Sequence, residues 1–281
     1  MTPRLPASAP AGPVFVHSDA LHSRLLVPRS HDREQLLASH LATLGSLSDG
    51  RDLWLPAFNY DFVHTLRFDV EADESQVGPI SETFRRGPGA WRTLVPVFSI
   101  SGTGPPPPLA TALPDLVDPF GDDSMFARHA ELDGIVLWYG APFGTTTFLH
   151  RVERASGGPV YRYDKDFAGT VVTHERTHHT VLRYHLYPLG RPLRYDWDRL
   201  LRRAADAGVV REVEGTGGVC LWAPADALGN HLLEAVAADP LDFLDGPSRD
   251  WVAPILERLG RRFELRDFEA DGSTPGASVE T

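Results

Sequence analysis

The chain has 281 residues, of which 42% are hydrophobic and 23% are charged, and these are ordinary values for a globular protein. Its net charge of -11 argues against a nucleic-acid partner, because the phosphate backbone attracts a basic surface. No apolar run approaches the roughly 18 residues that a membrane-spanning helix needs. The first residues lack the apolar core of a signal peptide, so we expect residues 1–12 to be a disordered leader and the protein to be cytoplasmic.

The first half of the chain alternates between strand and helix patterns. Short apolar runs predict strands at 13–18, 51–58, 92–100 and 134–140. Leucine and alanine at helical spacing, together with helix end signals, predict helices at 31–46, before Gly87, at 123–132 and from about Thr145. The proline-rich stretch 102–119 is expected to be a surface loop. This alternation predicts an α/β layered fold in a single domain, residues 13–268.

From about residue 159 the pattern becomes β-rich and is then followed by helices. We expect a helix at 196–208, a hairpin at 209–224 with its turn at 215–218, and terminal helices at 224–240 and 249–263. Residues 269–281 lack apolar content and are expected to be disordered. The only cysteine, Cys220, lies between apolar neighbours, which favours a buried structural thiol over a nucleophile.

Residues 174–178 spell H-E-x-x-H, the signature of zinc peptidases. In those enzymes the two histidines lie on one face of a helix. Here the flanking valine, threonine and tyrosine favour a strand, on which residues four apart are separated by about 13 Å, too far to share one zinc ion. We therefore expect a histidine-rich strand or hairpin and no metal. A metal site built across a hairpin turn stays open as an alternative, with the ligands His174, His178, His179 and His185.

His150 and Glu153 form a second candidate site, on the helix that follows the strand ending at Gly140. Residues three apart on a helix are neighbours, so the carboxylate can orient the imidazole as the acid does in a catalytic triad. This spacing makes His150 a candidate general base held by Glu153. A surface ion pair has the same spacing, so the pattern alone leaves both interpretations open.

The surrounding stretch resembles the aminoglycoside 3-N-acetyltransferase family, whose members carry G-A-P-x-x-x-x-T-x-L-H-x-x-E. The residues that fit this pattern are Gly140, Ala141, Pro142, Thr147, Leu149, His150 and Glu153. Val16, His17 and Ser18 match the family's V-H-S/A element, and further matches follow in order to residue 170. The chain departs from the family at Val95 and Met125, where the family has histidine and proline. The F-N-Y-D-F segment after Pro56 resembles the family branch found with sugar and polysaccharide biosynthesis.

The resemblance implies a three-layer α/β sandwich, with a central mixed β-sheet flanked by helices and a β-rich C-terminal third. It also implies an N-acetyltransferase that uses acetyl-CoA and no metal. The acceptor would be an amino group of an aminoglycoside-like or amino-sugar substrate, and a homodimer stays open as the assembly. By resemblance, His150 takes the proton of the attacking amine, Glu153 fixes its tautomer, and His17 is a second active-site histidine.

Further residues are expected to contact the two substrates. Ser18, Ser99 and Arg92 are expected near the coenzyme, and Tyr60, Asp61 and Glu82 near the acceptor. Backbone amides near Ser18 and the Ser99 hydroxyl are expected to stabilise the oxyanion. A Glu82–Arg92 ion pair is expected to shape the pocket. The arginines that remain candidates for the CoA phosphates are Arg85, Arg86 and Arg162.

Two other functions stay open. A zinc-dependent hydrolase would use His174 and His178. A CoA-binding protein without turnover would have Val95 and Met125 as its lesions.

Overall fold

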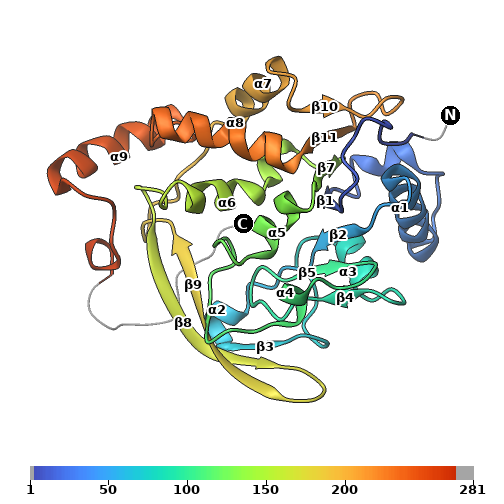
Figure 1. The fold of residues 1–281 in the computed structure, drawn as a ribbon, viewed down its shortest axis with the longest axis horizontal. Helices are drawn as coiled ribbons and strands as arrows, with labels where there is room; N and C mark the ends of the chain where they lie inside the picture. The colour runs from blue at the N-terminus through green and yellow to red at the C-terminus, as the bar shows by residue number, and fades with distance from the viewer. Residues whose placement is uncertain (1–2, 270–281) are drawn as a thin grey trace.

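The structure is a computed structural model that describes residues 3–269. Its larger sheet has seven strands in the order β10-β11-β7-β1-β2-β5-β4 (Figure 1). β1 runs parallel to β2 and β7, whereas β5 and β11 are antiparallel to those neighbours, so the predicted mixed sheet is confirmed. The strands are β1 (Val14–Ser18), β2 (Leu53–Pro56), β4 (Trp91–Arg92), β5 (Ile100–Gly102), β7 (Ile135–Tyr139), β10 (Arg211–Glu212) and β11 (Cys220–Pro224).

Helices cover both faces of this sheet, as the layered fold predicts. Val14 and Val16 of β1 pack in one hydrophobic cluster with leucines of α1 (Arg33–Ser48) and with α3 (Pro79–Arg85). Phe15 points to the opposite face, because successive strand residues alternate, and packs in a second cluster with α5, α6 and α8. These three helices span Met125–Glu131, Phe148–Ala155 and Ala225–Ala238. Burial on both faces explains why the central strands are apolar throughout.

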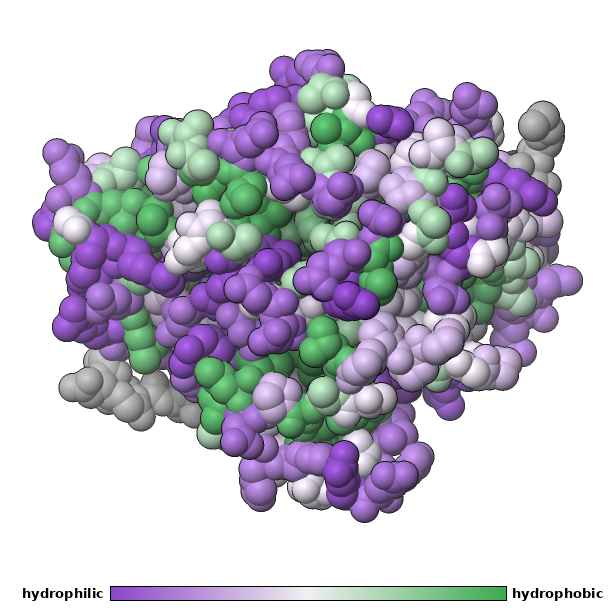
Figure 2. All heavy atoms as spheres, in the orientation of Figure 1, coloured by the Kyte–Doolittle hydropathy of each residue, from purple (hydrophilic) through white to green (hydrophobic). Residues whose placement is uncertain are grey.

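Four more α-helices and three 3-10 helices complete the part of the chain that the structure describes. The remaining α-helices are α2 (Phe62–Thr65), α4 (Pro108–Thr111), α7 (Trp197–Asp206) and α9 (Gly246–Leu259). The 3-10 helices are η1 (Ser23–Leu26), η2 (Phe143–Thr145) and η3 (Leu265–Asp267). Hydrophilic side chains cover most of the face drawn in Figure 2, with smaller hydrophobic areas between them. Within residues 3–269, no helix is both long and apolar enough to cross a membrane.

A second sheet of four strands, which the sequence did not predict as a separate layer, has the order β3-β8-β9-β6. Its centre is the long antiparallel hairpin of β8 (Tyr163–Val172) and β9 (Thr177–Leu186), which curves away from the larger sheet (Figure 1). β3 (Arg67–Asp69) and β6 (Leu116–Val117) come from the first half of the chain and pair in parallel with this hairpin. The predicted β-rich segment therefore completes a sheet that earlier residues begin.

Three local predictions are wrong. The stretch 92–100 is not one strand: β4 ends at Arg92 and β5 begins at Ile100, and Pro96 between them has no N–H for a strand ladder. The stretch 102–119 is not entirely loop, because it contains α4 and β6. Residues 3–12 are not a free leader: Leu5 is buried and its N–H donates to Leu47 O.

The predictions for the C-terminal region are largely confirmed. β10 and β11 form the expected hairpin, and α7, α8 and α9 match the expected helices within a few residues. Cys220 is buried, as expected for a structural thiol. Glu269, at the start of the expected tail, receives a hydrogen bond from the Tyr163 hydroxyl. The rest of that tail, residues 270–281, lies outside the described part of the chain.

Candidate active site

The turn after β7 places the candidate helix α6. β7 ends at Tyr139, and Gly140 follows with a φ of 69°, a left-handed conformation that favours glycine. A Cβ atom at Gly140 would lie 2.5 Å from the backbone nitrogen of Ser23, so a larger residue does not fit. The chain then forms η2 before α6 begins at Phe148, three residues later than the start expected from the sequence.

His150 and Glu153 meet on α6 as their spacing predicts. His150 Nδ1 lies 2.7 Å from Glu153 Oε2. The Glu153 side chain is only 1% exposed, whereas that of His150 is 20% exposed. Among residues 3–269, nothing forms a hydrogen bond with His150 Nε2. One imidazole nitrogen is therefore fixed by a buried carboxylate, and the other remains available at the surface.

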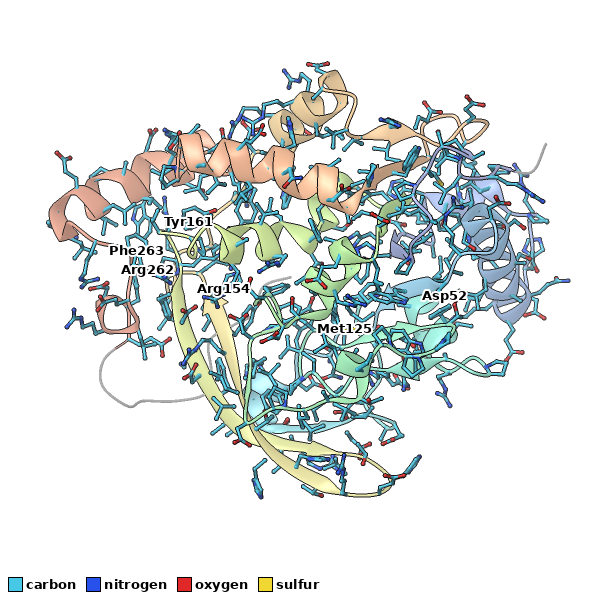
Figure 3. The ribbon with its side chains drawn as sticks, viewed as in Figure 1. Asp52, Met125, Arg154, Tyr161, Arg262 and Phe263 are labelled. Atoms are coloured by element: carbon cyan, nitrogen blue, oxygen red, sulfur yellow. The ribbon has the colours of Figure 1, made fainter. Side chains whose placement is uncertain are left out.

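Glu153 is surrounded by hydrogen-bond donors. The Tyr161 and Tyr195 hydroxyls donate to its Oε1 over 2.7 and 2.6 Å. Its Oε2, besides receiving His150, lies 3.7 Å from Arg162 Nε and 3.4 Å from His185 Nε2. Tyr161 reaches the carboxylate from the segment that joins α6 to β8 (Figure 3). The carboxylate is thus held by groups from several separate segments of the chain.

This environment sets the charges at the site. Burial opposes ionisation of Glu153, but the Arg162 charge, the hydrogen bond from His150 and the approach of His185 hold its pKa well below the ordinary value. Burial lowers the pKa of His150 and the Arg162 charge adds to this effect, against the opposing hydrogen bond from Glu153. Burial also lowers the pKa of His185 to about 3. Both imidazoles are therefore neutral at pH 7, beside an ionised Glu153.

Among residues 3–269, the only group of three side chains spaced as metal ligands is His150, Glu153 and His185, whose ligand atoms lie within 4.8 Å of one another. The positive charge of Arg162 beside the same carboxylate disfavours a divalent cation there.

The H-E-x-x-H residues do not lie on a helix. His174 and Glu175 lie between the strands of the β8–β9 hairpin, and His178 is on β9 opposite Val171. The predicted histidine-rich hairpin is confirmed, and the helical arrangement of a zinc peptidase is contradicted.

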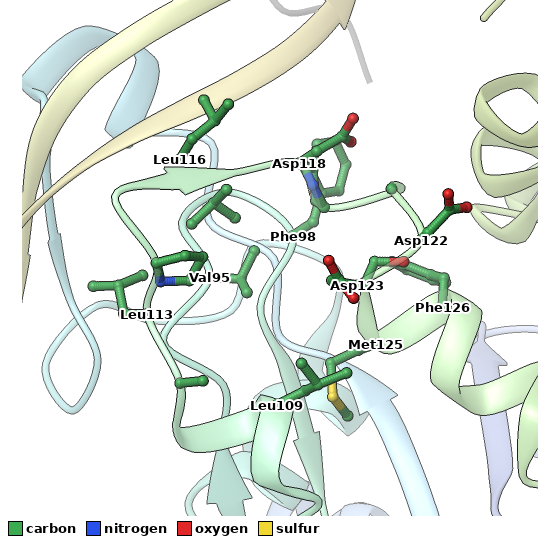
Figure 4. Close-up of a pocket in the computed structure, with 16 residues that line it drawn as sticks. Val95, Phe98, Leu109, Leu113, Leu116, Asp118, Asp122, Asp123, Met125 and Phe126 are labelled. Carbon is green, nitrogen blue, oxygen red and sulfur yellow. The ribbon is translucent and has the colours of Figure 1, made fainter. Parts of the chain in front are cut away.

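A pocket of about 540 Å³ lies beside this site (Figure 4). It brings together the two positions at which the sequence departs from the family pattern, Val95 and Met125. Its other apolar walls include Phe98, Leu109 and Phe126, and carboxylates stand at its edge. These carboxylates are Asp118, Asp122 and Asp123.

Phe120 connects the pocket to His150. Its ring centroid lies 4.7 Å from that of Phe98 and 5.2 Å from that of Phe126, both of which line the pocket. On its other side it lies 5.2 Å from the His150 ring. The predicted substrate residue Tyr60 is close to the same group, with its ring 6.4 Å from Phe98. A ligand in the pocket would therefore be separated from the histidine by one aromatic ring.

His17 lies at the end of β1 on the same face of the sheet as Phe15. It is buried, its ring lies 6.4 Å from that of Trp138, and its Nε2 has no hydrogen-bond partner within the described chain. Burial, and to a lesser extent His129, lowers its pKa to about 3. No hydrogen bond or ring contact joins it to His150 in residues 3–269. Its role as a second active-site histidine stays a prediction.

Most of the predicted oxyanion donors are already used. The backbone N–H groups of Asp19, Leu21, His22 and Ser23, which follow Ser18, all donate within the turn or to β7. The buried Ser99 hydroxyl donates to Ala57 O and accepts from Arg92, which also donates to the Val70 carbonyl. These residues hold the backbone together in this conformation, and their coenzyme contacts stay predictions.

The expected Glu82–Arg92 ion pair is wrong. Glu82 pairs instead with Arg85, one turn further along α3, over 2.7 Å, because residues three apart on a helix are closer than residues on separate segments. Asp61 is exposed at the start of α2. Arg162, one of the candidates for the CoA phosphates, is buried beside Glu153 and does not face solvent.

Sequence reasoning missed the groups that surround Glu153. Tyr161 and Arg162 lie in the Y-R-Y segment that resembles the family, but nothing local shows that they turn back to α6. Tyr195 is 42 residues away in the sequence and lies in no recognised motif. His185 was considered only as part of a metal site. The one available signal was at His185, a polar residue between Tyr184 and Leu186 on a predicted strand, which needs a hydrogen-bond partner when buried.

A family model described as Aminoglycoside 3-N-acetyltransferase matches residues 48–234. Aminoglycoside N(3)-acetyltransferase VII of Streptomyces paromomycinus is 30% identical over 192 residues, which are 68% of this chain and 62% of that protein. Aminoglycoside N(3)-acetyltransferase VIII of Streptomyces fradiae is 40% identical over 94 residues, 33% of this chain and 32% of that protein. Each match thus spans less than two thirds of the curated relative.

The fold is shared with solved structures at low sequence identity. Aminoglycoside acetyltransferase AAC(3)-Xa has a TM-score of 0.63 and 21% identity, covering 84% of this chain and 88% of that one. AAC-IIIb, in a binary complex with CoASH, has a TM-score of 0.64 and 19% identity, covering 83% and 92%. With the family match over most of its length, the chain belongs to the aminoglycoside 3-N-acetyltransferase family.

Proposed function

We propose that this protein transfers an acetyl group from acetyl-CoA to an amino group of an aminoglycoside-like or amino-sugar substrate. Family membership supports the reaction, and the names of the two curated relatives support an aminoglycoside as acceptor. The CoASH complex of AAC-IIIb supports acetyl-CoA as the co-substrate. The observation that carries the proposal is the His150–Glu153 pair, with one imidazole nitrogen fixed and the other available.

This pair suits direct attack of an amine on a thioester. An ammonium ion has no lone pair, so only the neutral amine can attack the thioester. This amine must give up a proton as its C–N bond forms. In this mechanism His150 Nε2 takes the proton, and Glu153 stabilises the imidazolium through Nδ1. The tetrahedral intermediate then collapses, the C–S bond breaks, and CoA leaves as a thiolate that takes up a proton. Cys220 takes no part, because burial raises its thiol pKa to about 12.

Because Phe120 separates the pocket between Val95 and Met125 from His150, we place there a part of the acceptor that is remote from the reacting amine. An aminoglycoside carries several ammonium groups, and the carboxylates at the edge of the pocket have the complementary charge. Asp122 is paired with Arg151 and Asp118 with Arg154, over 2.9 and 2.8 Å. Asp123 forms no ion pair with an arginine in residues 3–269, so the edge keeps a negative charge that is unfavourable for the phosphates of a nucleotide-linked amino sugar. The pocket therefore favours an aminoglycoside-like acceptor.

The test is release of CoA from acetyl-CoA in the presence of a panel of aminoglycosides and nucleotide-linked amino sugars. We expect turnover with at least one aminoglycoside and a loss of roughly 10²- to 10⁴-fold in His150→Ala, which removes the base. His178→Ala is the matched control, since it removes a histidine of the H-E-x-x-H segment and should retain turnover.

The other outcomes separate the remaining functions. A rise in melting temperature with acetyl-CoA, but no turnover on any amine, would favour a CoA-binding protein. Turnover that fails in His178→Ala and with a chelator would favour a zinc enzyme. An unchanged rate in His150→Ala would show that another group accepts the proton.

A further inference from the structure

The Tyr195 hydroxyl lies between a buried cation and a buried anion. It donates to Glu153 Oε1 over 2.6 Å and accepts from Arg162 Nε and Nη2 over 3.1 and 2.6 Å. A phenol has one proton to donate and lone pairs to accept, so this arrangement uses both capacities. The hydroxyl cannot act as the anion itself, because burial raises its pKa well above the ordinary value.

Arg162 and Glu153 do not form the direct pair that their burial favours. A guanidinium and a carboxylate usually meet through two parallel hydrogen bonds that occupy both carboxylate oxygens. Here the approach of Arg162 Nε to Glu153 Oε2 is 3.7 Å, longer than a hydrogen bond. The guanidinium instead donates to Tyr195 and to His185 O, and stacks 3.7 Å from the centre of the Tyr187 ring. Glu153 Oε2 is thereby left for His150.

We propose that Tyr195 is a positioning residue whose hydroxyl separates Arg162 from Glu153 and so reserves Glu153 Oε2 for His150. Without this hydroxyl, Arg162 would lose an acceptor beside an ionised carboxylate and would move onto it. Glu153 Oε2 would then accept hydrogen bonds from the Arg162 guanidinium, and His150 Nδ1 would lose its partner. The inference rests on the proposed function only for its effect on acetyl transfer, and not for the arrangement itself.

The other polar groups around His150 do not replace this function. Tyr161 donates to Glu153, but in residues 3–269 its hydroxyl forms no hydrogen bond with the Arg162 guanidinium. His185, on β9, is buried and neutral. The loop that carries Phe120 contributes Asp118 and Asp122, and each is paired with an arginine of α6. Tyr195 is therefore the one hydroxyl in residues 3–269 that contacts both Arg162 and Glu153.

The Tyr195 hydroxyl could act as a spacer between Arg162 and Glu153 or only as a donor to Glu153. These two roles predict opposite shifts in the pKa of His150 when the hydroxyl is removed. Tyr161→Phe removes one donor from Glu153 and leaves the spacer, so the carboxylate becomes more basic and the pKa of His150 should rise. Tyr195→Phe brings the Arg162 charge closer and weakens the hydrogen bond from His150, so the pKa should fall. The rate of acetyl transfer should also drop, by about tenfold or more, because the base is no longer oriented.

The experiment is an NMR titration of the His150 imidazole in the whole protein without substrates, together with the pH profile of kcat/KM. Tyr163→Phe is the matched control: it removes a tyrosine hydroxyl that binds Glu269, outside the site, and should shift neither quantity. If Tyr195→Phe does not fold, Tyr195→Trp carries the test. Its indole N–H still donates to Glu153 but accepts nothing from Arg162, so the same fall is expected.

A fall in the pKa of His150 with Tyr195→Phe, beside a rise with Tyr161→Phe, supports the spacer. A rise in both variants would overturn it and leave Tyr195 as a simple donor. A lower rate with no shift in pKa would also overturn it, since a purely structural role predicts that result. The titration needs no turnover. Opposite shifts in the pKa of His150 without acetyl transfer would therefore refute the proposed function but still support Tyr195 as a spacer.

Discussion

The buried charge of Arg162 offers the sharpest test of how the site is held together. The Arg162 and Glu153 side chains are only 3% and 1% exposed. Replacing Arg162 by methionine keeps a similar apolar stem and leaves the carboxylate buried without a cation. Removing one partner of a buried charge pair costs about 3 to 5 kcal/mol. For a chain of this size the lower figure corresponds to a fall in melting temperature of about 6 °C or more.

The stability lost in Arg162→Met should depend on pH, and the pKa of Glu153 sets the direction of that dependence. In the wild type the pKa of Glu153 is lowered on folding, so its contribution to stability is complete at neutral pH and is lost as the pH falls below the ordinary carboxyl pKa. In Arg162→Met, burial acts without the opposing charge and raises this pKa. The carboxyl can then become neutral, so the stability deficit should be largest near pH 8 and should shrink towards pH 5.

The assay is thermal unfolding of the wild type and Arg162→Met between pH 5 and 8. Arg183→Met is the matched control, because its pair with Asp166 is exposed and is worth at most about 1 kcal/mol. The double variant Arg162→Met, Glu153→Gln should recover part of the lost stability, since no uncompensated charge remains. A deficit that is independent of pH, or a double variant less stable than Arg162→Met, would refute this reasoning.

Three further outcomes are expected. Cys220 should not react with a thiol reagent in the folded protein but should react fully in denaturant, because burial raises its pKa to about 12; rapid reaction when folded would contradict its placement. Burial also lowers the pKa values of His17, His129 and His185 to about 3, 4 and 3, so the unfolded chain takes up three more protons below pH 6.5. Below pH 6.5, urea unfolding should therefore show a free energy of unfolding that falls by up to about 4 kcal/mol for each unit by which the pH is lowered. A free energy of unfolding that does not change with pH in this range would refute the three lowered pKa values. Dialysis against a chelator should leave the melting temperature and CoA release unchanged; loss of either would indicate a metal.

The sequence predicted what depends on local spacing. His150 and Glu153 are three residues apart on a helix, so their contact follows from helix geometry alone. The strand preference around His178 likewise follows from its neighbours. The Glu82–Arg92 pair failed for the same reason, because Arg85 is a closer partner on the same helix.

What the sequence did not predict depends on where distant segments meet. The Tyr195 hydroxyl reaches Glu153 only because the segment before α7 packs against the end of α6, and no pattern around Tyr195 indicates this contact. The charges that set the pKa of His150 come from these same segments. A histidine–carboxylate pair can therefore be predicted from a local motif, whereas the pKa of its imidazole requires the tertiary structure.

That Val95 and Met125 line the same pocket also depends on where distant segments meet, and the structure changes the interpretation of both residues. In the sequence they are two separate departures, 30 positions apart, and each could be a lesion. In the structure both line one pocket, and neither belongs to the His150–Glu153 pair, which is intact. The buried donors around Glu153 also remain complete, as turnover would require. If this pocket holds part of the acceptor, as proposed, two apolar side chains in place of a histidine and a proline favour a change of acceptor over a loss of turnover.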